Sequence, residues 1–152
     1  MQVRSDVTIA APIERVWALT VDIEHWPQLT PTMLEVDRLD AGPLRVGSRV
    51  RVTQPRQRPG VWVVTHLEPP TLFAWRRTLL GMTIIATHRL EPIDGGCRNT
   101  LTVEVAGRGA TLFSAVMSGP IRMAIETENA GFREVAERLT IESRSADGEA
   151  DA

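Results

Sequence analysis

The chain has 152 residues, the size of one domain, and its hydrophobic (43%) and charged (24%) contents are those of an ordinary globular protein. Its formal net charge of −2 gives no general attraction to phosphate backbones or anionic lipid, so we expect no nucleic-acid partner. There is no apolar run long enough for a membrane span and no signal-peptide core at the N-terminus, so we expect no stable membrane insertion. Cys97 is the single cysteine, which excludes an intrachain disulfide and favours a reducing, cytoplasmic location.

The N-terminal part predicts one strand followed by two short helices. Residues 2–10 alternate between apolar and polar side chains, which indicates a half-buried strand. Pro12 then suits the first turn of a short amphipathic helix over Ile13–Val21. A second helical turn, around residues 23–29, is limited by Pro27 and Pro31.

The middle of the chain predicts six further strands separated by turn residues. For the strand Gly60–Glu68 the sequence does not decide which side chains face the core, because Pro69 and Pro70 do not fix the type of loop that follows it. Either Trp62, Val64 and His66 face the core, or Val63, Thr65 and Leu67 do. The predicted strands are 33–39, Arg49–Thr53, Gly60–Glu68, Leu72–Leu79, 82–91 and 98–106.

Two hairpins give the clearest register. If Asp94 and Gly95 are the two turn residues, His88 lies opposite Leu101 and the apolar faces of both strands coincide. The same reasoning across Leu80 and Gly81 places Arg77 opposite Ile84. One inward face therefore carries Phe73, Trp75, Arg77, Ile84, Ala86, His88, Leu101, Val103 and Val105.

A long helix is predicted from about Ala110, with a break or kink at Gly119-Pro120. Its part from Pro120 to Leu139 would be about 30 Å long. Residues 143–152 are small, polar and acidic, so we expect a disordered tail after a folded domain of residues 1–142. Strands that run consecutively indicate an antiparallel sheet with helices on one face, an α+β fold. An apolar stripe at helical spacing comprises Ile121, Ala124, Ile125, Phe132, Val135, Ala136 and Leu139, interrupted by Glu128.

Several short motifs accompany this order of elements: Ala11-Pro12 with Val16-Trp17 and Asp22, Trp26-Pro27, Pro31, Gly47, Val64-Thr65 before Glu68-Pro69-Pro70, and Leu90-Glu91-Pro92 before Gly95-Gly96. With these motifs the chain resembles the SRPBCC superfamily, the START-like group of polyketide cyclases and lipid-transfer proteins. The resemblance covers about residues 1–141. It implies a helix-grip fold, in which a twisted antiparallel sheet of about seven strands wraps around the long C-terminal helix and can enclose an apolar ligand.

Three polar residues interrupt the predicted apolar surface and are the candidate catalytic residues. His88 suits a hydrogen-bond partner or general base, or else a buried histidine satisfied by a neighbour. Arg77 is suited to bind a carboxylate or enolate oxygen of a ligand, or else its side chain extends to the rim of the cavity. Glu128 suits a partner for Arg77 or His88, or else lies at the helix edge near solvent.

Aromatic residues complete the candidate ligand site. Trp62, Phe73 and Trp75 suit the walls of a pocket for an aromatic or polyene ligand, or a simple core, while Trp17 and Trp26 are assigned to packing. The apolar segment with Leu112, Phe113, Val116 and Met117 suits a lid, a dimer surface or a membrane-touching patch. The predicted ligand-binding residues are Trp62, Phe73, Trp75, Arg77, Ile84, Ala86, His88, Leu101, Val103, Ile121, Ile125 and Glu128.

These features favour binding of a hydrophobic small molecule such as a lipid, a polyketide or a quinone. A polyketide cyclase or dehydratase that uses the three polar residues is the alternative, and a protein-interaction module is a third. The three histidines are far apart in sequence and no dinucleotide or phosphate-loop motif is present, so we expect no metal and no cofactor. The sequence does not decide whether the protein forms a homodimer.

Overall fold

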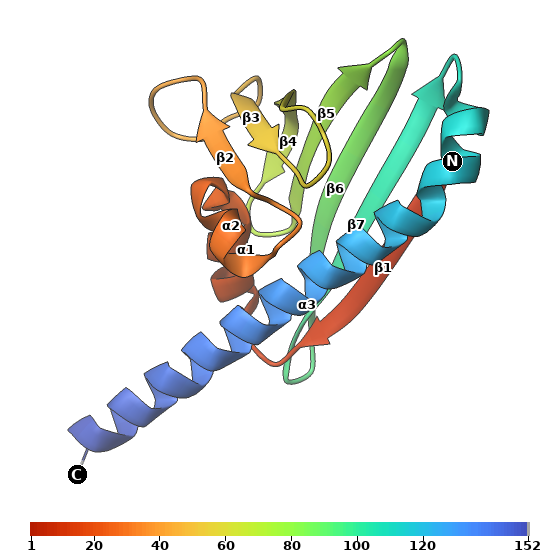
Figure 1. Ribbon diagram of the computed structural model, residues 1–152. Coiled ribbons are helices and arrows are strands. Elements are labelled where there is room, and N and C mark those ends of the chain that lie inside the picture. The colour runs from red at the N-terminus through yellow and green to blue at the C-terminus, as the bar shows by residue number, and fades with distance from the viewer. Residues whose placement is uncertain (152) are drawn as a thin grey trace.

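The computed structural model describes residues 1–151 and shows seven strands, three α-helices and one 3-10 helix in that range (Figure 1). Two helices and the 3-10 helix follow the first strand, and the long third helix ends the chain. In chain order the elements are β1 (Gln2–Ile9), α1 (Ile13–Val21), η1 (Ile23–His25), α2 (Trp26–Leu29), β2 (Glu35–Arg38), β3 (Arg49–Thr53), β4 (Gly60–Glu68), β5 (Leu72–Leu79), β6 (Met82–Ile93), β7 (Gly96–Gly107) and α3 (Ala110–Ala150).

The strands form one antiparallel sheet in the order β1-β7-β6-β5-β4-β3-β2. Helix α3 runs across one face of this sheet, and α1 and α2 pack beside it on the same side (Figure 1). This arrangement confirms the predicted α+β, helix-grip architecture. It leaves the inner face of the central strands directed toward α3.

Both predicted hairpin registers are confirmed. His88 pairs with Leu101, and Ile93 pairs with Gly96, so Asp94 and Gly95 are the two turn residues. Gly95 has a φ of +81°, a left-handed conformation that glycine adopts without a steric penalty. On the other side, β5 and β6 pair in the register that places Phe73 opposite His88.

The side chains of β4 change their facing along the strand. A register shift lies between Val64 and His66, which is a β-bulge. Before it, Trp62 and Val64 are buried, and after it His66 is exposed while Leu67 packs against the core. The extra residue of a bulge reverses the alternation of side chains, so each predicted facing holds for only one part of the strand.

Helix α3 is longer and more continuous than the sequence predicts. It passes through Pro120 without a break, and Figure 1 shows its first turns set at an angle to the long remainder. One proline removes a single intrahelical hydrogen bond, which bends a helix without ending it. The segment expected to be a disordered tail is helical through Ala150 and projects beyond the sheet, with residues 144–150 exposed (Figure 1). A helix closes its own backbone hydrogen bonds, so it does not need the apolar contacts that this segment lacks.

An aromatic cluster centred on Trp26 joins the helices to the sheet. The ring centroid of Trp26 lies 5.2 Å from that of Trp75, 5.7 Å from that of Phe132 and 6.1 Å from that of Phe73. These edge-to-face arrangements are the favoured ones for aromatic rings. Trp26 also donates its indole N–H to the backbone oxygen of Leu19 at 3.1 Å, which satisfies the buried polar atom of this ring.

The second half of α3 is anchored by close contacts. Asn129 donates to the backbone oxygen of Ser5 at 3.0 Å and accepts from Asn99 at 2.9 Å. Gly131 lies so close to α2 that a Cβ atom at this position would be 2.1 Å from the backbone oxygen of Leu29. These contacts fix both the height and the rotation of α3 over the sheet.

We therefore expect Gly131→Ala to destabilise the protein by about 1–3 kcal/mol, because the added methyl group must displace a backbone carbonyl. Gly148→Ala is the matched control, since no atom lies within 4 Å of a Cβ placed there. Urea denaturation of both variants measures the difference. A Gly131→Ala protein as stable as the control would contradict the close seating of α3 on α2.

Candidate functional site

A cavity of about 330 Å³ lies between the inner face of the sheet and the first half of α3. This volume is within the range of small-molecule sites, which starts at about 300 Å³. Strands β4 to β7 form one wall and α3 forms the other. The lining residues are Trp26, Met33, Gln54, Gln57, Trp62, Trp75, Arg77, Leu79, Ile84, Ala86, Thr87, His88, Leu101, Thr102, Val103, Phe113, Met117, Pro120, Ile121, Ala124, Ile125 and Glu128.

The structure places eleven of the twelve predicted ligand-binding residues on this lining, and Phe73 is the exception. Phe73 is fully buried, with its ring centroid 5.3 Å from that of Trp75 and 5.7 Å from that of His88. Strand parity correctly gave Phe73 the inward face. However, parity does not show that Trp26, Trp75 and His88 enclose it, so Phe73 supports the wall without reaching the cavity.

Other lining residues were missed by the sequence reasoning. Trp26 was assigned to packing alone, but it both packs in the core and lines the cavity. Phe113 and Met117 were considered only for a lid, a dimer surface or a membrane-touching patch. They continue the stripe of α3 toward its start at helical spacing, so extending the stripe would have added them to the ligand-binding residues. The loop residues Gln54 and Gln57 carry no periodic signal, and only the tertiary structure brings them to the cavity.

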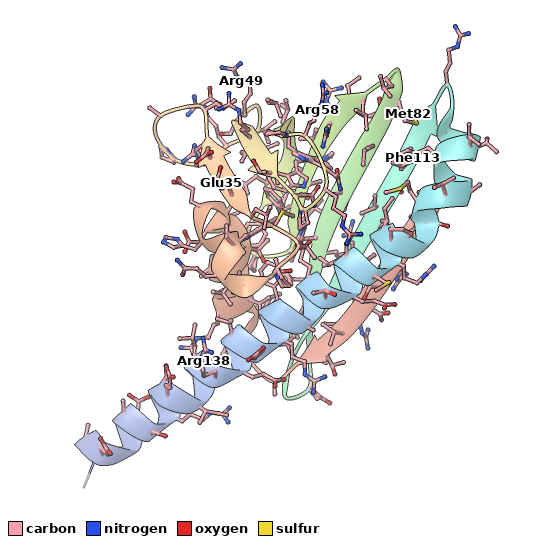
Figure 2. The ribbon with its side chains drawn as sticks, viewed as in Figure 1. Glu35, Arg49, Arg58, Met82, Phe113 and Arg138 are labelled. Atoms are coloured by element: carbon pink, nitrogen blue, oxygen red, sulfur yellow. The ribbon has the colours of Figure 1, made fainter. Side chains whose placement is uncertain are left out.

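The apolar segment at the start of α3 divides between two faces. Phe113 and Met117 line the cavity, whereas Leu112 and Val116 are exposed to 75% and 67%. In Figure 2 Phe113 is at the end of the molecule where α3 begins, close to the position of Met82 in the view. This end of the cavity, which also includes the exposed Gln57, is its mouth.

His88 and Glu128 meet at the deep end of the cavity. The Nε2 atom of His88 lies 3.3 Å from the Oε1 atom of Glu128, and the two residues are only 3% and 6% exposed. The alternation of β6 directs His88 inward, and the helical stripe of α3 places Glu128 above it. Of the partners considered for Glu128, the structure therefore selects His88.

Burial determines the charge state of this pair. It lowers the pKa of His88 to about 3 and raises the pKa of Glu128 to about 8, because the charged form of each group loses its hydration. Near neutral pH the carboxyl group keeps its proton and the imidazole is neutral. The deep end of the cavity therefore carries hydrogen-bonding groups without a formal charge.

Aromatic rings hold the imidazole in place. Its centroid lies 5.1 Å from that of Trp26 and 5.7 Å from those of Phe73 and Phe132. The Nδ1 atom of His88 and the Nε1 atom of Trp62 are buried and have no hydrogen-bond partner among residues 1–151. Buried polar atoms are normally paired, so these two are candidates for contact with a bound molecule.

Arg77 lines the same cavity at some distance from the pair. It lies opposite Ile84, four residues from His88 along β6, which corresponds to roughly 13 Å along the strand. Its guanidinium group packs over Gly60, where a Cβ atom would be 2.3 Å from Cζ of Arg77. The expected polar cluster is therefore divided into a buried pair and a separate arginine.

Two other depressions lie on the outer surface of the protein. Trp17 lines one of them with Asp22 and Arg38, and Asn129 lines the other with Glu126. Both are open to solvent and lie outside the enclosed space. Within residues 1–151, no group of three or more histidine, cysteine or acidic side chains is placed to hold a metal ion. Within the same residues, no helix is long and apolar enough to cross a membrane.

Residues 1–140 match the family of polyketide cyclases, dehydrases and lipid transport proteins. The chain belongs to this family. The match covers almost all of the chain, and it confirms the resemblance to the SRPBCC superfamily that the sequence motifs indicate. A comparison with curated protein sequences finds no match.

Solved structures of family-like proteins confirm the fold. The Zhui aromatase/cyclase from a Streptomyces species has a TM-score of 0.77 at 19% identity, and the match covers 92% of this chain and 95% of that one. A hypothetical protein from Helicobacter pylori has a TM-score of 0.76 at 13% identity, with 90% and 88% covered. The di-domain ARO/CYC BexL of the BE-7585A biosynthetic pathway has a TM-score of 0.72 at 18% identity, with 92% and 47% covered. This chain therefore corresponds to about half of that protein.

The buried pair predicts a specific dependence of stability on pH. The raised pKa of Glu128 makes the folded state retain a proton that the unfolded chain releases near 4.5, so the free energy of unfolding falls as the pH rises toward 8. The lowered pKa of His88 acts in the opposite direction, but only below its ordinary value of 6.5. Between pH 6.5 and 8 the opposing effect of His88 is absent, and stability should decline; the raised pKa of the exposed His25, which hydrogen-bonds to Asp22, adds to this decline.

We expect Glu128→Gln to reduce this decline to the part that His25 contributes, because the amide has no proton to release in that range. Urea denaturation at intervals across the range measures it. Glu126→Gln, at an exposed position of the same helix, is the control and should keep the decline. Parallel curves for the wild type and Glu128→Gln would show that Glu128 does not retain its proton in the folded state.

Proposed function

We propose that this protein binds a hydrophobic small molecule, of the lipid, polyketide or quinone class, in the cavity between the sheet and α3. The observation that supports this proposal is a mostly apolar cavity of about 330 Å³ with an uncharged polar pair at its deep end. An apolar space with a few orienting polar groups is the usual form of a small-molecule site. A protein-interaction module needs no such enclosed space.

The walls suit a flat or chain-like apolar molecule. The rings of Trp62 and Trp75 are 5.3 Å apart at 32° and present an apolar surface from neighbouring strands. At the deep end, the protonated carboxyl group of Glu128 can donate a hydrogen bond to a carbonyl or hydroxyl oxygen. Membership of a family that includes both polyketide cyclases and lipid transport proteins agrees with this class of ligand.

Filling the cavity should abolish binding. Ala86 lies in the middle of the sheet wall, so Ala86→Phe should project a ring into the cavity and reduce binding of the neutral probe N-phenylnaphthylamine at least about tenfold. Ala106→Phe, at an exposed position of the adjacent strand, is the matched control and should bind like the wild type. Fluorescence titration measures both. Native mass spectrometry of the wild type should detect a co-purified apolar molecule that is absent from Ala86→Phe.

One observation favours a second function, that of a cyclase or dehydratase. Glu128 and His88 supply a proton donor and a proton acceptor 3.3 Å apart. In this scheme Glu128 donates its proton to a ketone oxygen while His88 accepts a proton from the adjacent carbon, which gives an enol. Transfer of the proton from the imidazolium to the carboxylate then restores both groups. The enol carbon is the nucleophile that ring closure requires.

The two functions differ in the effect of conservative variants. If the pair is catalytic, Glu128→Gln and His88→Phe should each lower turnover of a polyketone analogue by about 100-fold or more, since general acid–base catalysis contributes at least that much. Binding of the naphthylamine probe should change little, because both substitutions nearly preserve side-chain shape. Glu126→Gln should keep full turnover. Turnover that is unaffected in both pair variants would remove the pair from any mechanism.

A further inference from the structure

The cavity has one formal charge, and it belongs to Arg77. Among its described lining residues, Arg77, His88 and Glu128 are the ionisable ones. The latter two face each other, and burial keeps both neutral near pH 7. No carboxylate among residues 1–151 forms an ion pair with Arg77. Arg77 is half-buried, and a guanidinium that lines an apolar cavity without a carboxylate partner is available to bind an anionic group of a ligand.

Arg77 lies at the mouth, where an anionic group can keep part of its hydration. Its guanidinium packs over Gly60, the residue that follows the loop of residues 54–59. That loop carries Arg56 and Arg58 and has no acidic residue. Figure 2 shows Arg58 in the same half of the view as Phe113, which lines the cavity from the start of α3. The loop that contributes Gln54 and Gln57 to the lining thus adds two further cations near Arg77, which favours the approach of an anion.

The deep end selects against a second charge. A carboxylate placed beside His88 and Glu128 would be buried without a countercharge, which costs far more than a neutral hydroxyl or carbonyl does. The wall between the two ends is apolar, with Trp75, Ile84 and Ala86 facing inward. The two ends are roughly 13 Å apart along the strand. An extended chain of about ten carbons, with bonds of about 1.5 Å, has a comparable length.

We propose that the ligand is an elongated amphiphile with a single anionic group, which Arg77 holds at the mouth while the uncharged end reaches His88 and Glu128. This inference rests on the proposed binding function and adds the polarity and orientation of the ligand. A carboxylate, sulfate or phosphate presents the paired oxygens that the planar fork of a guanidinium recognises.

Isothermal titration calorimetry with decanoate, decanol and decanedioate tests the proposal. Wild-type protein should bind decanoate about tenfold or more tightly than decanol, because only decanoate offers an anion to Arg77. It should bind decanedioate about tenfold or more weakly than decanoate, because the second carboxylate would enter the deep end. Equal affinities within either pair would overturn the proposal without any variant.

Variants assign the preference to the residue. Arg77→Gln should lose the preference for decanoate over decanol, and Arg77→Lys should keep part of it through charge alone. Arg76→Gln is the matched control, because Arg76 is the exposed neighbour on the same strand and the substitution removes the same charge. An Arg77→Gln protein that still prefers decanoate would overturn the assignment.

The naphthylamine probe distinguishes a failure of the anion inference from a failure of the proposed binding function. If the wild type binds this neutral probe but does not prefer decanoate to decanol, the inference about the anion is wrong and the binding function stands. If it binds neither the probe nor any of the three aliphatic compounds, the binding function itself is wrong.

Discussion

The part of α3 that follows Glu128 packs closely against its neighbours. There Gly131 touches α2, Phe132 meets the ring of Trp26, and Asn129 hydrogen-bonds to β1. Before Glu128 the side chains of α3 line the cavity. The same helix therefore packs directly on one half of the sheet and covers the cavity over the other half. The contacts after Glu128 set the height of α3 over the sheet, and the cavity lies under the part of the helix that precedes Glu128.

The boundary between these two halves is where the chemistry of the site arises. Glu128 is the last residue of α3 that lines the cavity, and it faces His88 where water is already excluded. Burial therefore neutralises both groups through their pKa values. Toward the mouth the cavity is lined by the guanidinium group of Arg77, a cation. One cavity thus has an apolar centre, a neutral hydrogen-bonding end and a cationic end, and the proposed selection of ligands by polarity and length rests on this pattern.

Family membership of this protein follows from its sequence, whereas its function is inferred from the cavity. The match over residues 1–140 establishes the family, whereas solved structures at 19% identity or less establish the fold alone. The cavity and its polar atoms therefore support the proposed ligand binding. The contact between His88 and Glu128 supports the proposed catalysis, and in a binding protein the same contact would orient an oxygen atom of the ligand.

The sequence alone determined the order of elements, two hairpin registers and the inward face of β5 to β7, because alternation along strands and the turn at Gly95 are local properties. It also nominated the three polar residues of the cavity. Tertiary structure decided what local patterns do not contain: the bulge in β4, the enclosure of Phe73, and the arrival of a distant loop at the mouth. It alone paired Glu128 with His88 and left Arg77 apart, because the height of α3 over the sheet depends on contacts between residues far apart in the chain.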